Sequence, residues 1–395
     1  MKNILFINEN DISPQRGGIE SITTTLVQEL IKKNKYRFHL AYYKDIDESF
    51  IRPFFNTRTK LSRREGSKQL SDLILKNNIN TIIIQQLPMA VEILQRVIDK
   101  ERRHIDVIYV QHDYLSNSLI RSIKNYMLFL LKNGSGIERA KASVKLALFP
   151  LYSFYIQKYL RHKIGTACTY ADKIVILSQR FRLPGQKYIR KENIHKVTAI
   201  GNCLTLNSCL PSSSILTKKK EVLIVSRLDE NRKRLLVALK IWSIIESTNT
   251  FSDWHLSIVG CGRDENIYKK EAERLGLTQL SFEGTQQSII EYYSKASIFM
   301  MTSDMEGWGL TLTESLQMGV IPLVFDSFES VHDIIENNVN GFILPNNNIN
   351  VYAKCLENLM KDDCLRILMA KKAIESSQKF SVDKIINQWS DLIEK

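Results

Sequence analysis

Short apolar runs alternate with longer amphipathic stretches along most of this 395-residue chain. Each apolar run is typical of a strand buried in a parallel sheet, and the stretch that follows it fits a helix. Strands joined by helices form parallel sheets with right-handed crossovers, so the sequence predicts an α/β fold. The predicted strands cover residues 2–8, 37–43, 81–85, 106–110, 172–178 and 196–202, and then 221–226, 254–259, 280–283, 296–301 and 321–326.

The alternation falls into two series, which suggests two domains, and the length is sufficient for both. Between them, residues 205–220 are rich in Asn, Ser and Pro and contain three successive lysines, and we interpret them as a linker. The predicted domains are therefore an N-terminal one at 1–204 and a C-terminal one at 221–379. We expect the amphipathic helix at 380–395 to pack back towards the N-terminal domain.

A glycine-rich turn and a helix follow the predicted strand at 296–301. The turn contains Glu306, Gly307 and Gly309, and the helix begins near Leu310. Such a turn leaves free backbone N–H groups and the positive end of a helix dipole at the carboxyl edge of the sheet, where anions bind.

Two carboxylates belong to this turn and helix. Glu306 lies in the turn and Glu314 lies further into the helix, so both could face one cleft. Carboxylates there can accept hydrogen bonds from sugar or ribose hydroxyls. The alternative is that both are ordinary solvated glutamates around a helix start.

Two further turns of the second series are candidates for the same site. Arg227 and Lys233 follow the strand at 221–226, where two cations and a helix N-terminus would form a diphosphate site; a basic turn of no special role is the alternative. Gly284 provides a conformationally permissive turn after the strand at 280–283.

In the first series, Gly17 and Gly18 stand between a strand and a helix, where backbone can approach a phosphate; a plain tight turn is the simpler interpretation. His112 and Asp113 follow the strand at 106–110, at the edge that lines the ligand crevice of open α/β sheets. His112 could donate to a sugar hydroxyl, and Asp113 could orient it or bind an acceptor. Equally, Asp113 could cap the next helix.

The formal net charge of +13 is concentrated between residues 120 and 163, which contain nine Lys or Arg residues and a single acid, Glu138. Apolar helices bracketed by cations can lie on an anionic membrane surface, and we favour this over a helical hairpin with a solvated basic face. Six scattered cysteines indicate a reducing compartment, and no apolar run is long enough to span a bilayer. We therefore expect a cytoplasmic protein, peripheral at the inner face of the cell membrane.

Glu306 and Glu314 stand eight residues apart in the segment Glu-Gly-Trp-Gly-Leu-Thr-Leu-Thr-Glu, with Arg227 and Lys233 about eighty residues upstream. Together with Gly17-Gly18 and His112-Asp113, in this order, the pattern resembles the family 4 retaining glycosyltransferases of bacterial capsule, O-antigen and exopolysaccharide assembly. The resemblance covers nearly the whole chain. It implies the GT-B fold, in which two Rossmann-like parallel-sheet domains face each other across a cleft.

The resemblance also implies roles for these residues. Arg227 and Lys233 would hold the diphosphate of a nucleotide sugar and stabilise the leaving group. Glu306 would bond the donor-sugar hydroxyls, Glu314 the ribose, and His112 the donor sugar near the reacting carbon, while Asp113 would bind the acceptor. The donor site would further include Gly17, Gly18, Gly284, Gly307, Trp308, Gly309, Leu310 and Thr311. The family usually has Phe or Pro at the place of Trp308, which leaves the two carboxylates in register.

The implied activity is transfer of a hexose from a nucleotide diphosphate sugar, expected to be UDP-linked, to a polysaccharide or lipid-linked oligosaccharide. No metal or other cofactor is expected, because Arg227 and Lys233 would supply the positive charge; Asp45-Ile46-Asp47 is interpreted as a solvated turn. A sugar-nucleotide epimerase or phosphorylase is the enzymatic alternative. A non-enzymatic protein that binds membranes or nucleic acid through its basic face is less favoured, and no nucleic-acid partner is expected.

Overall fold

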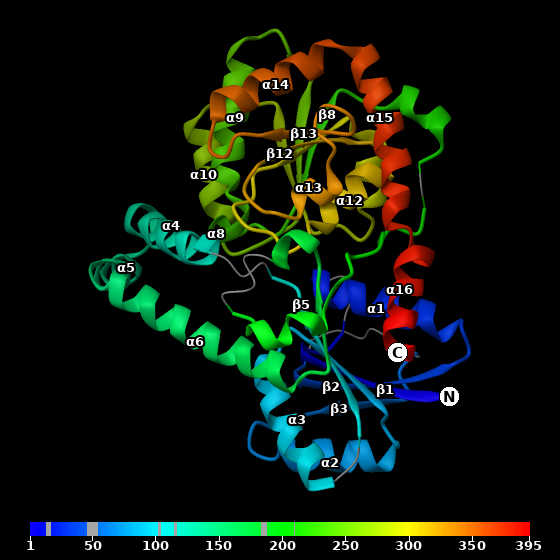
Figure 1. The fold of residues 1–395 in the computed structure, drawn as a ribbon. Coiled ribbons are helices and arrows are strands. Elements are labelled where there is room, and N and C mark those ends of the chain that lie inside the picture. Colours follow the sequence, from blue (N-terminus) through cyan, green and yellow to red (C-terminus); the bar gives the residue numbers. More distant parts are fainter. Residues whose placement is uncertain (13–16, 46–53, 102–103, 114–116, 183–187, 209) are drawn as a thin grey trace. The chain divides into compact units, whose positions relative to one another are not determined.

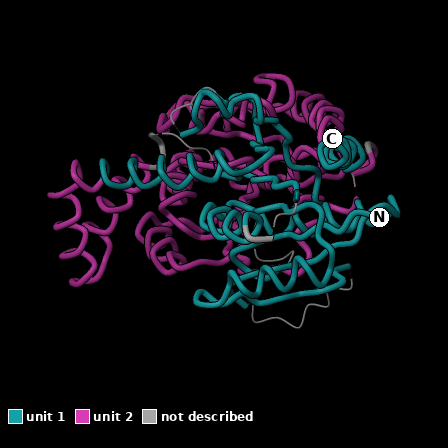
Figure 2. The backbone as a smooth tube through the Cα atoms, turned by 60° about the horizontal axis from the view of Figure 1, so that its bottom comes forward, with its two compact units in different colours: residues 1–115, 153–205, 381–395 teal, residues 116–152, 206–380 magenta. Residues whose placement is uncertain are grey.

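The computed structural model describes residues 1–12, 17–45, 54–101, 104–113, 117–182, 188–208 and 210–395. The chain divides into two compact units (Figures 1 and 2). Unit 1 comprises residues 1–115, 153–205 and 381–395, and unit 2 comprises residues 116–152 and 206–380. The segment 116–152 therefore belongs to unit 2, although the sequence assigns it to the N-terminal domain. Ile46 and Asp47 lie outside the described residues.

Unit 1 is built on a seven-stranded sheet with the strand order β3-β2-β1-β4-β5-β6-β7, and its neighbouring strands pair in parallel. The strands are β1 (Lys2–Asn10), β2 (Tyr36–Lys44), β3 (Thr57–Lys60), β4 (Thr81–Gln85), β5 (Asp106–Gln111), β6 (Lys173–Ile176) and β7 (Val197–Ala199). The helices are α1 (Gly18–Ile31), α2 (Gly66–Lys76), α3 (Pro88–Glu101), most of α6 (Phe149–Tyr170) and α16 (Val382–Glu394), with 3-10 turns at Gln179–Phe181 and Lys191–Lys196.

The core of unit 1 lies around the central strands. Ile4, Leu5, Phe6 and Ile7 of β1 are fully buried, as expected for a strand covered on both faces. Helix α16 closes the unit through its apolar side chains, and its C-terminal end is held by two hydrogen bonds. Lys2 Nζ donates to Ile393 O at 2.7 Å, and Lys173 Nζ donates to Leu392 O at 2.9 Å.

Unit 2 is built on a six-stranded parallel sheet with the order β10-β9-β8-β11-β12-β13. The strands are β8 (Glu221–Val225), β9 (His255–Val259), β10 (Leu280–Gly284), β11 (Ile298–Met301), β12 (Ile321–Phe325) and β13 (Phe342–Leu344). The helices are α4 (Asn117–Asn133), α5 (Gly136–Ala147), α8 (Glu230–Lys233), α9 (Leu235–Ser247), α10 (Glu265–Arg274), α11 (Ile290–Lys295), α12 (Leu310–Gln317), α13 (Val331–Ile334), α14 (Ile349–Lys361) and α15 (Asp363–Ser377), with 3-10 turns at Ser212–Thr217 and Gln378–Phe380.

Each unit thus has the Rossmann-like arrangement predicted from the alternation of strands and helices. In both sheets the chain reverses its direction of strand addition beside the first strand of the unit, between β1 and β4 and between β8 and β11. Ligands of open α/β sheets bind at the carboxyl ends of the strands flanking such a reversal. Among the described residues, no helix combines the length and the apolar content needed to cross a bilayer.

Candidate donor site

The predicted site residues fall into two groups. Gly17, Gly18, His112 and Asp113 belong to unit 1, and the others belong to unit 2. In unit 2 the candidates lie in turns that follow β8, β10 and β11, which are neighbours or near neighbours in one sheet.

The turn after β8 carries Arg227 and lies directly against the turn after β9. Ser226 N donates to Val259 O at 3.0 Å, and Leu228 N donates to Cys261 O at 2.9 Å. A Cβ at Gly260 would lie 2.0 Å from Ser226 O, and one at Gly262 would lie 2.3 Å from Leu228 O. Gly260 and Gly262 therefore permit close contact between two backbone turns, where a side chain at either position would have no room.

Gly284 ends β10 with a φ of +66°, a conformation that favours glycine. Its carbonyl accepts a hydrogen bond from Gly260 N at 2.8 Å. Gly284 is thus joined to the same group of turns as Arg227.

Arg227 and Lys233 lie at opposite ends of the turn and short helix that follow β8. The Arg227 side chain is exposed, and no ion pair to it is recorded among the described residues. Lys233 is the last residue of α8, and its Nζ lies 2.5 Å from Glu306 Oε1. The structure therefore brings Lys233 and Glu306 together from segments 73 residues apart.

Glu306 is only 9% exposed in the turn between β11 and α12. Burial acts to raise the pKa of this carboxyl, but the charges of Lys233 and Arg232 and the hydrogen bonds from Lys233 and Ser303 outweigh it, so the pKa lies below its ordinary value. Glu306 is therefore ionised at neutral pH. It can accept hydrogen bonds, and it is unsuited to donate a proton.

Gly309 precedes the first residue of α12 and has a φ of +94°, which favours glycine at this position. No side chain caps the helix there, and Leu312 N, the third N–H group of the helix, donates to Gly309 O at 2.9 Å. The N–H groups of Leu310 and Thr311 stand at the first two positions of the helix, where an anion can bind, and their binding of one stays a prediction.

Trp308 is buried like Glu306, but its side chain packs against an apolar neighbour. Its ring meets Phe380 edge-on, with 5.5 Å between the ring centroids. The indole therefore fills the interior of unit 2, where another large apolar side chain could replace it.

Glu314 is also buried, and its partner was not foreseen. Tyr293 Oη donates a hydrogen bond to Glu314 Oε2 at 3.0 Å and lies 3.3 Å from Thr311 O. Burial, followed by the charge of Glu314, raises the pKa of Tyr293 well above its ordinary value, so the hydroxyl remains a donor. Tyr293 lies in an unremarkable amphipathic helix, and no feature of the sequence distinguishes it.

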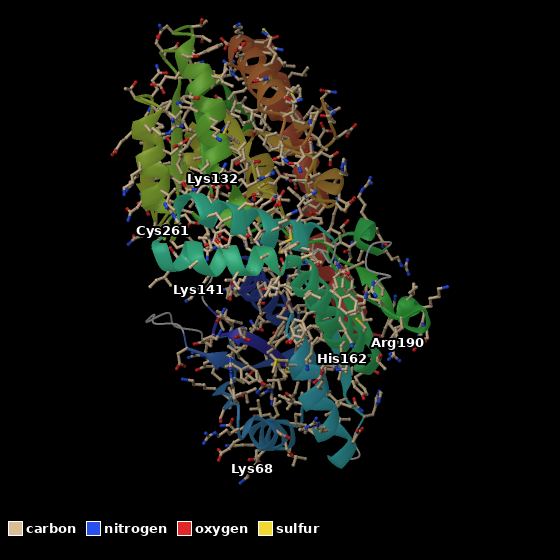
Figure 3. The ribbon with its side chains drawn as sticks, turned by 90° about the vertical axis from the view of Figure 1, so that its left-hand side faces the viewer. Lys68, Lys132, Lys141, His162, Arg190 and Cys261 are labelled. Atoms are coloured by element: carbon tan, nitrogen blue, oxygen red, sulfur yellow. The ribbon has the colours of Figure 1, made fainter. Side chains whose placement is uncertain are left out.

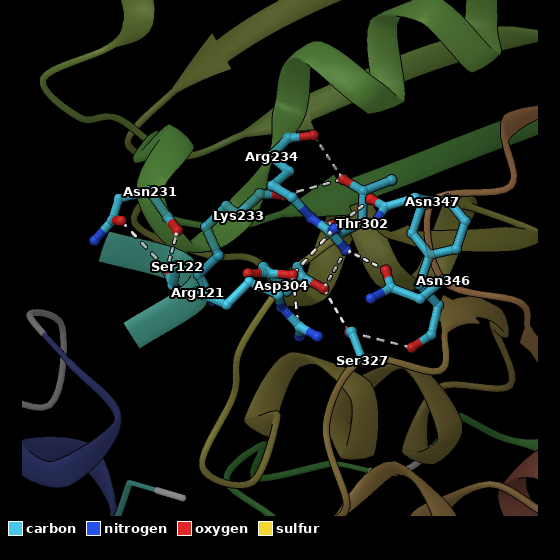
Figure 4. Close-up of polar contacts among 12 residues, drawn as sticks. Arg121, Ser122, Asn231, Lys233, Arg234, Thr302, Asp304, Ser327, Asn346 and Asn347 are labelled. Atoms are coloured by element: carbon cyan, nitrogen blue, oxygen red, sulfur yellow. Dashed lines mark hydrogen bonds and ion pairs between the residues drawn. The ribbon is translucent and has the colours of Figure 1, made fainter. Parts of the chain in front are cut away.

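A second unforeseen group surrounds Arg234 and Asp304 (Figure 4). Arg234 Nη1 lies 3.1 Å from Asp304 Oδ1, and the guanidinium also donates to the carbonyls of Thr302 and Ser303 at 2.8 and 2.9 Å. Asn346 and Asn347 accept further hydrogen bonds from it at 3.0 and 2.6 Å. Arg234 therefore holds the start of the turn that carries Glu306, and it is the next residue after Lys233.

In unit 1, Gly17 precedes α1 in extended backbone with a φ of −177°, and residues 13–16 lie outside the described residues, so the tight-turn interpretation stays a prediction. A Cβ on Gly17 would lie 2.4 Å from Glu20 Oε2, the end of a flexible side chain. Gly18 is the first residue of α1 and is exposed. A helix N-terminus without a side-chain cap stands here, as at α12.

His112 directly follows β5 and is buried, and its Nε2 lies 2.5 Å from Gln85 Oε1. Gln85 Nε2 donates to Thr23 Oγ1 at 3.1 Å, so the amide oxygen faces the ring and His112 Nε2 is assigned as the donor. Burial lowers the pKa of His112 to about 4, despite the opposing charge of Asp113. His112 is therefore neutral near pH 7, with Nδ1 as an acceptor.

Asp113 Oδ2 accepts a hydrogen bond from Gln86 Nε2 at 2.7 Å. The carboxylate is thus tied to the end of the neighbouring strand β4. Residues 114–116, between Asp113 and α4, lie outside the described residues. Capping of the next helix by Asp113 therefore stays a prediction.

Residues 210–380 match the family model described as glycosyl transferases group 1. An uncharacterized glycosyltransferase of Haemophilus influenzae is 27% identical over 264 residues, which are 66% of this chain and 72% of that protein. The poly(glycerol-phosphate) alpha-glucosyltransferase of Bacillus subtilis is 22% identical over 411 residues, covering 94% of this chain but only 60% of that protein's length.

Solved structures agree on the fold. Anabaena HepE in complex with UDP-glucose superposes with a TM-score of 0.74 at 16% identity, over 100% of both chains. The lipopolysaccharide outer core galactosyltransferase WaaB superposes with a TM-score of 0.67 at 14% identity, over 99% of both chains. The chain thus has the GT-B fold of these solved glycosyltransferases, and its residues 210–380 are similar to the glycosyl transferases of group 1.

Proposed function

We propose that this chain is a family 4 glycosyltransferase that moves a hexose from a UDP-sugar to a polysaccharide or lipid-linked oligosaccharide, with retention of the anomeric configuration. The observation that carries the proposal is the Lys233–Glu306 pair beside the uncapped N-terminus of α12, with Glu314 further along the same helix. A cation, a free helix N-terminus and two buried carboxylates are the groups needed to bind a diphosphate, a sugar and a ribose.

In this proposal the donor diphosphate lies between Arg227, Lys233 and the N–H groups of Leu310 and Thr311. Arg227 is exposed and available, and Lys233 would exchange part of its contact with Glu306 for a phosphate oxygen. These fixed positive groups stabilise the negative charge that develops on the departing diphosphate. We propose that transfer needs no metal, because the two side-chain cations and the helix dipole supply this stabilisation.

The carboxylates and the histidine would orient the donor. Glu306 is ionised and would accept hydrogen bonds from sugar hydroxyls, and Glu314 would accept from the ribose. His112 would contact the donor sugar through its Nδ1 lone pair, since its Nε2 proton is engaged with Gln85. Gly17 and Gly18 would approach the diphosphate, and Asp113 would bind the acceptor. The donor site would be shaped by Gly284, Gly307, Trp308 and Gly309.

The named relatives support the donor and acceptor classes. Anabaena HepE, whose fold this chain shares, was crystallised with UDP-glucose and also with UDP and glucose. A Campylobacter jejuni relative, 25% identical over 247 residues, is named as an N-acetylgalactosaminyltransferase acting on an undecaprenol-linked glycan. A lipid-linked acceptor would place the reaction at the inner face of the cytoplasmic membrane.

Exposed apolar and basic side chains support a membrane contact in the segment 120–163. Lys132 and Lys141 are exposed on α4 and α5 (Figure 3). Leu151, Phe154 and Tyr155, on successive turns of α6, are 66–71% exposed. Large apolar side chains and cations carried by one segment of the chain fit the boundary of an anionic bilayer. Co-sedimentation tests this contact: we expect the protein to bind phosphatidylglycerol vesicles and not phosphatidylcholine vesicles. Phe154→Ser should weaken this binding. Binding to neither kind of vesicle, or equal binding to both, would contradict the membrane contact.

Donor binding is tested by thermal shift against UDP-, GDP-, ADP- and TDP-sugars in the presence of EDTA. We expect stabilisation by UDP-sugars, its loss in Lys233→Ala, and its retention in Lys269→Ala, which removes an exposed lysine that pairs with Glu265 and lies over the ring of Phe282. Incubation with the bound sugar nucleotide and a lipid-linked glycan should then give an α-linked product by NMR. Epimerised donor without acceptor, or inverted linkage, would overturn the proposal.

A further inference from the structure

Helix α4 contributes side chains to the two segments that carry Lys233 and Glu306 (Figure 4). Arg121 Nη2 lies 3.5 Å from Asp304 Oδ1, and Ser122 Oγ donates to Asn231 O at 2.7 Å. Asn231 is two residues before Lys233, and Asp304 is two residues before Glu306. All of these residues belong to unit 2.

Asp304 is the most constrained member of this group. It is 2% exposed, and Arg234 and Arg121 approach the same carboxylate oxygen, at 3.1 and 3.5 Å. Its backbone N–H donates to Arg232 O at 2.8 Å. A buried carboxylate is costly unless its charge is balanced, so the two guanidinium groups fix where Asp304, and hence the start of the Glu306 turn, can lie.

Helix α4 makes a third contact, with the turn that follows β9. The guanidinium of Arg263 stacks over the ring of Tyr126, 4.6 Å from its centroid, and Arg263 Nη2 lies 2.9 Å from Asp229 Oδ1. Asp229 in turn caps α8, because its side chain accepts from Asn231 N at 3.1 Å. Helix α4 therefore contacts α8 through Ser122, the β11–α12 turn through Arg121 and the β9–α10 turn through Tyr126, and the last contact reaches Asp229 through Arg263.

We propose that Arg121 and Ser122 of α4 are positioning residues that set the spacing between Lys233 and Glu306. The inference rests on the donor site proposed above and extends it to a helix about one hundred residues upstream. Neither side chain needs to touch the substrate. Ser122 fixes the backbone before Lys233, Arg121 fixes the carboxylate before Glu306, and one rigid helix joins the two. Misplacing a catalytic group by about 1 Å can cost about a hundredfold in rate.

The test compares Arg121→Gln and Ser122→Ala with matched controls. Arg274→Gln removes an arginine paired with Glu271 on the surface of α10, and Ser243→Ala removes a hydroxyl bonded only within α9. We expect Arg121→Gln to lower kcat about tenfold or more with the acceptor KM unchanged, and Ser122→Ala to have a smaller effect in the same direction. Arg121→Lys, which keeps a charge beside Asp304, should recover part of the loss. Wild-type kinetics in both α4 variants, or an equal loss in the controls, would overturn the proposal.

A second readout does not depend on activity. A double-mutant cycle compares the melting temperatures of Arg121→Gln, Asp304→Asn and the double variant. If α4 holds Asp304, the double variant should lose less Tm than the sum of the single variants. Additive losses would contradict the coupling even if the protein binds UDP-sugars. Failure to bind any nucleotide sugar together with a non-additive cycle would instead reject the proposed function while retaining the α4–Asp304 coupling.

Discussion

At the residue scale, Glu230 connects stability to pH. This carboxyl lies in α8 and accepts a hydrogen bond from Leu236 N at 3.1 Å. Burial raises its pKa from 4.5 to about 7, more than that hydrogen bond and the charge of Arg234 lower it. Between these two values the folded state binds more protons than the unfolded state, so the free energy of unfolding should fall as pH rises through this window.

Glu230→Gln tests this link. The amide keeps an oxygen for Leu236 N–H and removes the charge, so we expect the variant to be more stable than wild type at pH 8, by about 2 kcal/mol. The advantage should shrink as the pH falls from about 7 to 4.5, because Glu230 becomes protonated first in the folded state and then in the unfolded state. Urea unfolding at pH 4.5, 6 and 8 measures it, and a constant difference at the three values would rule out the titration as its cause.

His112 provides a second test at the same scale. Because burial lowers its pKa to about 4, its imidazole should remain neutral from pH 5.5 to 8. In NMR spectra of histidine-labelled protein, one ring resonance should fail to titrate over this range and should vanish in His112→Asn. A midpoint near 6.5 for that resonance would show that the ring is exposed to water, and His112 would then be available as a proton donor.

At the scale of one element, Gly309→Ala tests how helix α12 begins. The φ of +94° at this position strains any L side chain, and the distortion would move the N–H groups of the first turn. We expect a loss of stability of about 1–2 kcal/mol and weaker UDP-sugar binding. Gly136→Ala is the control, because a Cβ there meets nothing within 4 Å. Equal melting temperatures in the two variants would show that α12 starts without strain.

At the scale of elements, the sequence predicted the strand–turn–helix at 296–319 well, because an apolar run, a turn with Gly307 and Gly309, and a helix pattern adjoin each other there. It missed β3 at Thr57–Lys60, where polar side chains alternate between half-buried and exposed positions at the edge of the sheet. It also could not place α4. The amphipathic pattern shows that α4 has a buried face, but the contacts of Arg121 with Asp304 and of Ser122 with Asn231 are long-range and leave no local signal.

In the candidate site, too, some residues could be predicted from the sequence and others could not. Lys233, Glu306, Gly309 and Glu314 were recognisable because their spacing is local to strand ends. Tyr293, Arg234 and Asp304 were not, because each acts through a partner far along the chain. The roles themselves remain predictions until donor binding is measured.

At the scale of the whole molecule, the first strand and the last helix belong to the same unit. Trp389 of α16 is buried in unit 1, next to Ser390, whose Oγ lies 2.9 Å from Tyr36 Oη of β2. The chain therefore leaves unit 1, forms most of unit 2 and returns to complete unit 1. Unit 1 should depend on the last fifteen residues even though its sheet is formed from the first two hundred.

Trp389→Ala tests this dependence. Removing a buried tryptophan typically costs about 3–5 kcal/mol, and here the loss should fall on unit 1. Hydrogen exchange should then rise in peptides from β1, β2 and β6, while peptides from β8, β11 and β12 keep their protection, because compact units can open separately. Leu368→Ala, at a residue of α15 that is 59% exposed, is the control and should change neither set. Protection lost equally in both sheets would mean that the two units unfold as one, and α16 would then stabilise the whole chain rather than unit 1 alone.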